Sequence, residues 1–194
     1  RQRQMCIRDR YIGTSNGIFL YDIDKMEIGE RITGTENTSG SLYSAQIGTM
    51  IRVGDRVFAV HQKDGLLVID AKTHTLETTI LKPEEHEGHG LGSIVLSKDG
   101  TIWASPTVEL TGTGASLPLI WKVDPTTLTV QQVDIPTTSG IEEIPNSWYA
   151  WTADGFCAST KENKIYWKGQ GTGSWFTGYK IFCYDIDKNE FYKV

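Results

Sequence analysis

The segment GLLVIDAKTHTL, residues 65–76, combines an apolar run, an aspartate, a polar turn and a second apolar residue. The same order recurs in GIFLYDIDKMEI (17–28), PLIWKVDPTTLTV (118–130) and YKIFCYDIDKNEF (179–191). In each copy an apolar residue follows six positions after the aspartate, and successive aspartates are 48, 54 and 61 residues apart. An aspartate that leads a turn accepts hydrogen bonds from the backbone of that turn. The repeat therefore predicts four antiparallel hairpins.

Two further apolar segments precede three of these hairpins. The first reads GTMI (48–51), GSIV (92–95) and GFCA (155–158), and the second reads RVFAV (56–60), TIWA (101–104) and KIYW (164–167). Each unit thus contains four predicted strands, which we name A to D in chain order. Residues 66–69 are apolar at consecutive positions, as expected for a sheet that is covered on both faces. A β-sandwich would alternate more clearly and a β-solenoid has shorter coils, so the repeat favours a β-propeller.

We predict an all-β fragment of a β-propeller, with about four blades of four antiparallel strands, from a propeller of seven or eight blades. The partial propeller covers residues 11–194: an incomplete blade at 11–33, without strand A and most of strand B, and blades at 44–80, 90–135 and 148–194. Residues 1–10, RQRQMCIRDR, carry four arginines and resemble translated sequencing-adapter sequence. We interpret them as a non-native leader.

Composition excludes some classes of partner. The formal net charge is −5, and it becomes −8 when the four arginines and one aspartate of residues 1–10 are removed. An acidic domain without a basic stripe argues against nucleic acid and against anionic membrane surfaces. No apolar run approaches the length of about 20 residues that a transmembrane helix needs, and no signal peptide is visible.

The predicted strands place Cys157 and Cys183 two strand spacings apart, which is too far for a disulfide. We predict that both are buried thiols.

Loop lengths distinguish the two faces of the predicted propeller. The A–B and C–D turns are short, whereas the B–C and D–A connections are long and variable: 34–44, 81–90, 105–117, 136–147 and 168–178. Variable loops on a rigid scaffold commonly form binding sites, so we place the site on this second face, around the central channel. The predicted ligand-binding residues are Tyr43, Gln46, His61, Gln62, His89, Trp148, Tyr149, Trp151, Trp175 and Phe176. The aromatic residues suit stacking on a flat or sugar-like ligand, although packing between blades would also explain them.

Other motifs point less clearly to chemistry. The loop that contains His86, Glu87 and His89 offers weak metal-ligand candidates, but its spacing matches no known metal motif. Gly169–Gly173 has the composition of a phosphate-binding loop without its lysine or following helix. The turn-leading aspartates allow a calcium interpretation, and the stronger alternative is that they bond their own turns. We therefore predict no metal site, no cofactor and no catalytic residues.

A family resemblance adds an expectation about function. The hairpins LLVIDAKTHTLETTI (66–80) and IWKVDPTTLTVQQVDI (120–135) resemble YncE-like, surface-layer-type propeller repeats. The segments GSIVLSKDGTIWAS (92–105) and SWYAWTADGFCAS (147–159) resemble a Bacteroidetes propeller family classed as a domain of unknown function. Surface lipoproteins of gut Bacteroidetes that capture vitamin B12 are similar.

This resemblance implies an exported protein at the cell surface, outer membrane or periplasm that captures a small ligand beside an outer-membrane transporter. A corrinoid is one candidate ligand. Two alternatives stay open. One is a propeller enzyme of the metal-assisted lyase or lactonase type that uses His86, Glu87 and His89, and the other is a protein-interaction platform.

Overall fold

The computed structural model describes residues 9–36, 47–61, 63–82, 85, 89–109, 119–135, 148–150, 156–171 and 179–194. These residues form four antiparallel sheets, which we number 1 to 4 in chain order. Sheet 1 contains β1 (Asp9–Thr14), β2 (Gly17–Asp22) and β3 (Glu27–Arg31), and sheet 2 contains β4 (Ile47–Val53), β5 (Arg56–His61), β6 (Gly65–Asp70) and β7 (Thr75–Ile80). Sheet 3 contains β8 (His89–Leu96), β9 (Ile102–Glu109), β10 (Leu119–Val123) and β11 (Val130–Asp134). Sheet 4 contains β12 (Trp148–Ala150), β13 (Cys157–Ala158), β14 (Lys164–Gly171), β15 (Tyr179–Asp185) and β16 (Glu190–Lys193).

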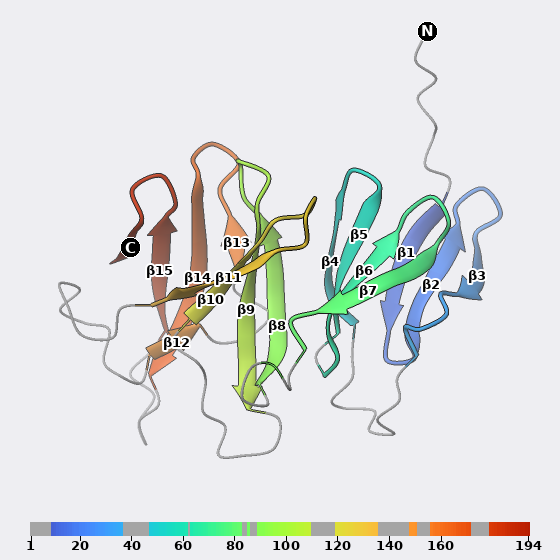
Figure 1. Ribbon diagram of the computed structural model, residues 1–194, viewed down its shortest axis with the longest axis horizontal. Coiled ribbons are helices and arrows are strands. Elements are labelled where there is room, and N and C mark those ends of the chain that lie inside the picture. Colours follow the sequence, from blue (N-terminus) through green and yellow to red (C-terminus); the bar gives the residue numbers. More distant parts are fainter. Residues whose placement is uncertain are drawn as a thin grey trace, which may run out of the picture.

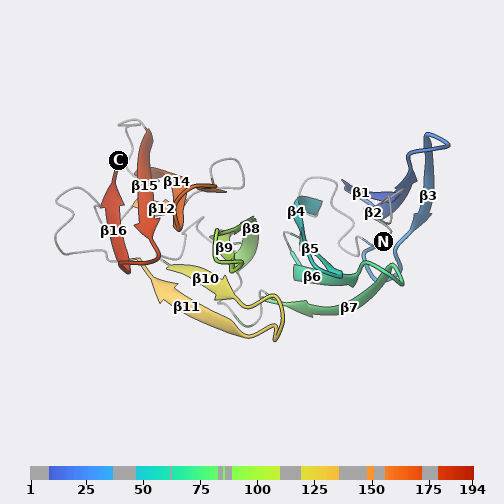
Figure 2. The same cartoon turned by 90° about the horizontal axis from the view of Figure 1, so that it is seen from above.

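The sheets stand side by side along an arc (Figures 1 and 2), and the strands of each sheet follow one another in chain order, apart from β13 in sheet 4. The strands β7 and β11 lie on the outer side of this arc (Figure 2). This arrangement confirms the predicted all-β class and the repeating strand–turn–strand unit. It is the radial stacking that relates the blades of a propeller.

The structure corrects several predicted strand limits. Strand β1 pairs with β2 from Asp9 to Thr14, so the first blade retains more of strand B than the sequence indicated. Strand A of the last blade is divided into β12 and β13, which both pair with β14. Residues 105–109 and 168–171 were predicted as loop, but they extend β9 and β14. Gly169–Gly171 therefore belongs to a strand and not to a phosphate-binding loop.

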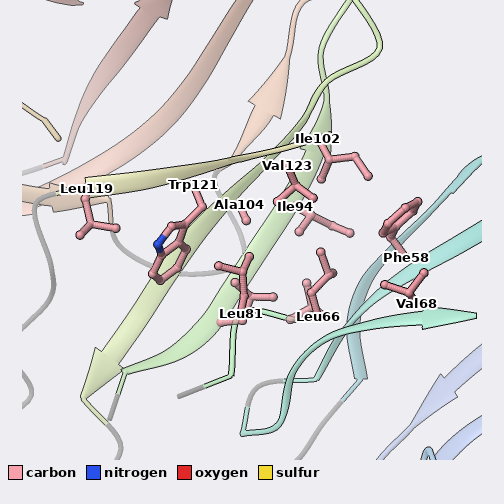
Figure 3. Packing of buried hydrophobic residues seen from close by; sticks show 12 residues of the cluster. Phe58, Leu66, Val68, Leu81, Ile94, Ile102, Ala104, Leu119, Trp121 and Val123 are labelled. Carbon is pink, nitrogen blue, oxygen red and sulfur yellow. The ribbon is translucent and has the colours of Figure 1, made fainter. Parts of the chain in front are cut away.

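Hydrophobic side chains fill the space between neighbouring sheets. In β5, Val57 and Ala59 pack toward sheet 1, whereas Phe58 and Val60 pack toward sheet 3. Figure 3 shows Phe58 and Val68 of sheet 2 facing Ile94 and other side chains of sheet 3. Because successive strand residues point to opposite faces, a strand between two sheets needs apolar residues at every position. The consecutive apolar positions in the sequence are thus explained.

The turn-leading aspartates bond their own turns. In three hairpins the Oδ1 atom accepts two backbone N–H groups, at 3.0 and 3.1 Å for Asp22, 2.7 and 2.9 Å for Asp70, and 2.7 and 2.9 Å for Asp124. These bonds lower the pKa of Asp70 and Asp124, and the Lys25 side chain is the main cause of the lowered pKa of Asp22. Asp185 accepts the N–H of Lys188 at 3.2 Å. The turn interpretation is confirmed.

The A–B and C–D turns gather at one end of the sheets, at the top of Figure 1, which we call the short-turn face. The Asp55 carbonyl of an A–B turn accepts the N–H of Ala71 in a C–D turn at 2.7 Å. In sheet 4 the Asn163 side chain donates to Asp187 Oδ1 at 2.9 Å across the equivalent turns. The predicted grouping of these turns on one face is therefore confirmed.

Both strand cysteines are free thiols, as expected, but their burial differs. Cys183 is fully buried, whereas Cys157 is exposed, so the prediction of two buried thiols is wrong for Cys157. The backbone register places Cys157 opposite Tyr166 and Tyr166 opposite Cys183, on the face of sheet 4 that is turned away from sheet 3. Cys157 is exposed because β13 is a two-residue strand at the sheet edge.

Candidate functional site

The best-defined candidate residue is His61, the last residue of β5. It lies opposite Ile47 of β4 and Gly65 of β6, on the face of sheet 2 that packs against sheet 1. Its side chain is only 2% exposed. The position is at the opposite end of β5 from the short-turn face, where the B–C connection begins. We call this second end the long-loop face.

One nitrogen of the His61 imidazole is paired and the other is not. Nδ1 accepts the backbone N–H of Asp64 at 3.0 Å, and Asp64 Oδ2 lies 3.1 Å from the same nitrogen. Nε2 is buried and has no hydrogen-bond partner among the residues that the structure describes. A buried polar group without a partner is uncommon in folded proteins and calls for a specific explanation.

The electrostatics of the site favour a neutral imidazole. Burial lowers the pKa of His61 below its ordinary value, and this effect outweighs the opposing influence of the nearby Asp64 carboxylate. A neutral imidazole that accepts a hydrogen bond at Nδ1 carries its proton at Nε2. In this tautomer the unpaired nitrogen of His61 is an N–H donor; in the other, Nδ1–H donates to Asp64 Oδ2 and the unpaired nitrogen is an acceptor.

Sheet 1 approaches sheet 2 closely beside this imidazole. A Cβ atom on Gly13 of β1 would lie 2.5 Å from Cγ2 of Ile47, the residue that pairs with His61. A larger side chain than glycine would thus force the two sheets apart at this point. Ala59, two residues before His61 on the same face of β5, is fully buried, so the imidazole adjoins the apolar packing between sheets 1 and 2.

The other predicted site residues are described only in part. The backbone of His89 begins β8 opposite Glu109, and Trp148 and Tyr149 lie in β12 opposite Gly171 and Gln170. The following predicted residues lie outside the described residues: Tyr43, Gln46, Gln62, His86, Glu87, Trp151, Trp175 and Phe176. The candidate set therefore keeps its status as a prediction, apart from the position of His61.

A small polar cluster escaped the sequence analysis. Thr49 Oγ1 lies 3.0 Å from Ser93 Oγ across β4 and β8, and Ser105 Oγ accepts the N–H of Ser93 at 3.2 Å. Ser93 and Ser105 are almost fully buried. The signal was present in the sequence, because Thr49 and Ser93 follow glycines at the same position of the repeat. These hydroxyl groups satisfy one another, so they fix the inner strands of neighbouring sheets.

Two further features bear on possible ligands. A groove of about 380 Å³ lies on the outer side of the arc between β7 and the β10–β11 hairpin, and it is lined by Thr79, Ile80, Leu81, Lys82, Glu85, Trp121, Val130 and Gln132. Among the described residues, no group of three or more His, Cys, Asp or Glu side chains is arranged to hold a metal ion.

Comparison with known proteins identifies the family. The model of the family described as "Domain of unknown function (DUF5074)" matches residues 6–193. The chain belongs to the DUF5074 family. The match begins within residues 1–10, the segment that the sequence analysis set aside. It agrees with the resemblance to a domain of unknown function, and no curated protein matches this DUF5074 chain.

Solved structures similar to the DUF5074 chain share its fold at low sequence identity. Two are extracellular domains from B. thetaiotaomicron, one of a protein described as a one-component system (13% identity, TM-score 0.62) and one of a hybrid two-component system (14% identity, TM-score 0.60). The two matches cover 97% and 96% of this chain, but this chain spans only 21% of the length of each of the two solved chains. The WD40 domain of Neurospora crassa Pan2 (9% identity, TM-score 0.53) is also similar, and the match covers 98% of this chain and 50% of the Pan2 chain. The four sheets thus correspond to part of a larger propeller.

The part of the DUF5074 chain that the structure describes contains no helix with the length and apolarity required to cross a membrane.

Proposed function

We propose that this DUF5074 chain is part of a non-catalytic propeller that captures a small ligand at its long-loop face. The observation that carries the proposal is the contrast between the two faces. On the short-turn face, Arg56 Nη1 donates to the carbonyls of Pro125 and Thr126 at 3.0 and 2.8 Å, and Lys98 Nζ donates to the Lys161 carbonyl at 3.0 Å. Polar groups there are used to join neighbouring blades. At the opposite face the B–C connections are short in sheets 1 and 2 and long in sheets 3 and 4, and this face also holds the half-paired His61.

Export is a second part of the proposal. The two B. thetaiotaomicron structures are extracellular domains, and the sequence resembles surface propellers of Bacteroidetes. An exported ligand-binding propeller would deliver its ligand to a neighbouring outer-membrane transporter or report it to the cell. Both uses need the same step, which is reversible capture of a ligand without chemical change. A corrinoid is the ligand class that we propose from the sequence resemblance.

The proposal is tested by titrating the 194-residue chain with cyanocobalamin and following tryptophan fluorescence and calorimetric heat. We expect saturable binding that a chelator does not change. Trp175→Ala, at a residue that the sequence predicts to bind the ligand, should weaken binding, whereas Lys98→Ala on the short-turn face should not. Absence of saturable binding would count against the corrinoid.

Two other outcomes would replace the proposal. Hydrolytic or eliminative turnover that requires a divalent metal and is lost in His89→Ala would establish the enzyme alternative. Stable co-purification with a membrane transporter, without affinity for any small molecule, would establish the interaction platform.

A further inference from the structure

We propose that His61 recognises the ligand directly, as a hydrogen-bond donor from Nε2 to an oxygen atom of the ligand. This inference rests on the proposed function and adds the contact, its location and the chemistry of the group that it accepts. The site lies at the long-loop end of the seam between sheets 1 and 2, beside Ile47 and Gly13.

The first argument is the unequal pairing of the imidazole. The side chain is 98% shielded from solvent, Nδ1 has its partner at 3.0 Å, and Nε2 has none within the described chain. Leaving a buried donor unpaired lowers the stability of a fold. A group that merely completed the packing at this position would be better served by an apolar side chain, so the donor indicates an acceptor that arrives from outside.

A comparison with Asn163 shows why this orphan is informative. Asn163 Oδ1 is also buried without a partner, but the same side chain donates to Asp99 at 3.3 Å and to Asp187 at 2.9 Å. Its role in joining two turns on the short-turn face is therefore accounted for. His61 makes no equivalent link between sheets, because its one bond closes the turn that starts at His61 itself.

The second argument is that the donor is held in a fixed orientation. The N–H of Asp64 favours the tautomer in which Nδ1 accepts and Nε2 carries the proton, whereas Asp64 Oδ2, 3.1 Å from Nδ1, favours the opposite tautomer; our proposal takes the first. Gly65, opposite His61 in the strand pair, adds no side chain that would cover the ring. A donor whose direction and protonation are set before binding loses little freedom when a ligand arrives.

The third argument concerns the class of ligand. A neutral N–H donor in an apolar seam suits a carbonyl oxygen or a carboxylate oxygen, which share the same acceptor chemistry. The two acceptors differ in their effect on the protonation of the His61 imidazole. A carboxylate at Nε2 would favour the charged imidazole, whose Nδ1–H would then donate to Asp64 Oδ2, already 3.1 Å away. Lys63 on the same turn opposes that charge, and the neighbouring Ile47 and Gly13 carry none.

The decisive experiment compares His61→Gln with His61→Asn. The Gln amide can place an N–H near the Nε2 position, whereas the Asn oxygen can replace Nδ1 but leaves no donor toward the ligand. We expect cyanocobalamin affinity to fall about tenfold in His61→Asn, the value of one lost hydrogen bond, and to fall much less in His61→Gln. Equal affinities in the two variants, or a larger loss in His61→Gln, would overturn the inference. Unchanged binding in both would leave the proposed function intact and reject the role of His61.

A second measurement uses the unaltered chain and does not depend on cyanocobalamin or on the folding of a variant. NMR of the histidine imidazole nitrogens is recorded while acetate, and separately acetamide, is added. We expect a saturable change at His61 Nε2 and none at His74, whose Nδ1 lies 2.9 Å from the Tyr11 hydroxyl. Binding that strengthens at lower pH for acetate but not for acetamide identifies carboxylate recognition. Binding of acetamide alone identifies carbonyl recognition. The same response at all histidines, or none at His61, would reject the site.

Discussion

The residue four positions after each turn-leading aspartate should limit the stability of its hairpin. These residues are Met26, His74, Leu128 and Asn189, with φ angles of 55°, 56°, 61° and 55°. All four are in the left-handed region, which is unfavourable for residues with a Cβ atom and is tolerated best by glycine and asparagine. Three of the four hairpins therefore carry a side chain that their backbone conformation disfavours.

Met26 is the cleanest position for a test, because its side chain is 78% exposed and little packing is lost on truncation. The left-handed conformation costs an L-residue about 1–2 kcal/mol. Glycine returns about 0.4–1 kcal/mol of that through the greater freedom of its unfolded chain. Met26→Gly should therefore raise the free energy of unfolding by about 0.5–1 kcal/mol, which corresponds to a rise in Tm of about 1–4 °C for a domain of this size.

Thermal unfolding followed by circular dichroism measures the effect, with two controls. Met26→Ala keeps the Cβ atom and should leave Tm unchanged. Asn189→Gly should lower Tm, because asparagine already tolerates the conformation and its Oδ1 accepts the Tyr184 hydroxyl at 2.6 Å. If Met26→Gly and Met26→Ala behaved alike, the backbone conformation would not be the cause, and the reasoning would be refuted.

Four further predictions follow from the structure. The pKa of Asp70 is lowered by two turn N–H groups, so the stability that its carboxylate contributes is present above about pH 4 and is lost as the pH falls through the lowered pKa. Asp70→Asn should therefore reduce the dependence of the unfolding free energy on pH below about pH 4. An unchanged dependence would contradict this. Burial lowers the pKa of His61, so the unfolded chain takes up the proton first and stability falls below about pH 6.5; His61→Asn should remove this dependence. In the folded chain, iodoacetamide should modify Cys157 rapidly and spare buried Cys183, whose thiol pKa burial raises; peptide mapping that shows equal modification would argue against the fold of sheet 4. Phe58→Ala should cost about 3–5 kcal/mol in urea unfolding because it opens a cavity between sheets 2 and 3, and a loss below about 1 kcal/mol would contradict their packing.

The hairpins were predictable because their determinants are local. An aspartate and its turn backbone lie within four residues of one another, so the sequence alone contains the whole interaction. Apolar residues at consecutive positions added the information that both faces of a strand are covered. These two signals were sufficient for strand order, turn positions and radial stacking, which the hydrogen bonds of Asp70 and Asp124 and the packing around Phe58 confirm.

Strand ends on the long-loop face were less predictable, because pairing with other strands extends them. Residues 105–109 include Pro106 and resemble a loop, but β9 continues through them beside β8. The register of this pair shifts on both sides of Leu91, which accommodates the irregular backbone. Such shifts depend on the partner strand. The exposure of Cys157 also depends on tertiary context, because the two-residue β13 gives it little cover.

The candidate site shows the same division. The sequence placed His61 on the long-loop face from the order of strands alone. It could not indicate which imidazole nitrogen is paired, because that depends on the 3.0 Å approach of the Asp64 N–H. The repeat aligned Thr49 with Ser93, but their contact could not be derived from it, since the two residues are 44 positions apart and meet only when sheets 2 and 3 pack together.

Loop length alone is a weak criterion for assigning a binding face, and the state of the polar groups is a stronger one. A face whose charged side chains already bond neighbouring turns, as Arg56, Lys98 and Lys72 do, has few donors left for a ligand. Recognition needs a donor that is oriented, protected from water and still unpaired. In the described chain, His61 meets all three conditions at the long-loop end of the sheets. Under the proposed function, blade cohesion and ligand capture would use opposite ends of the same strands, so that the loops at one end could vary without loosening the turns that hold the blades together.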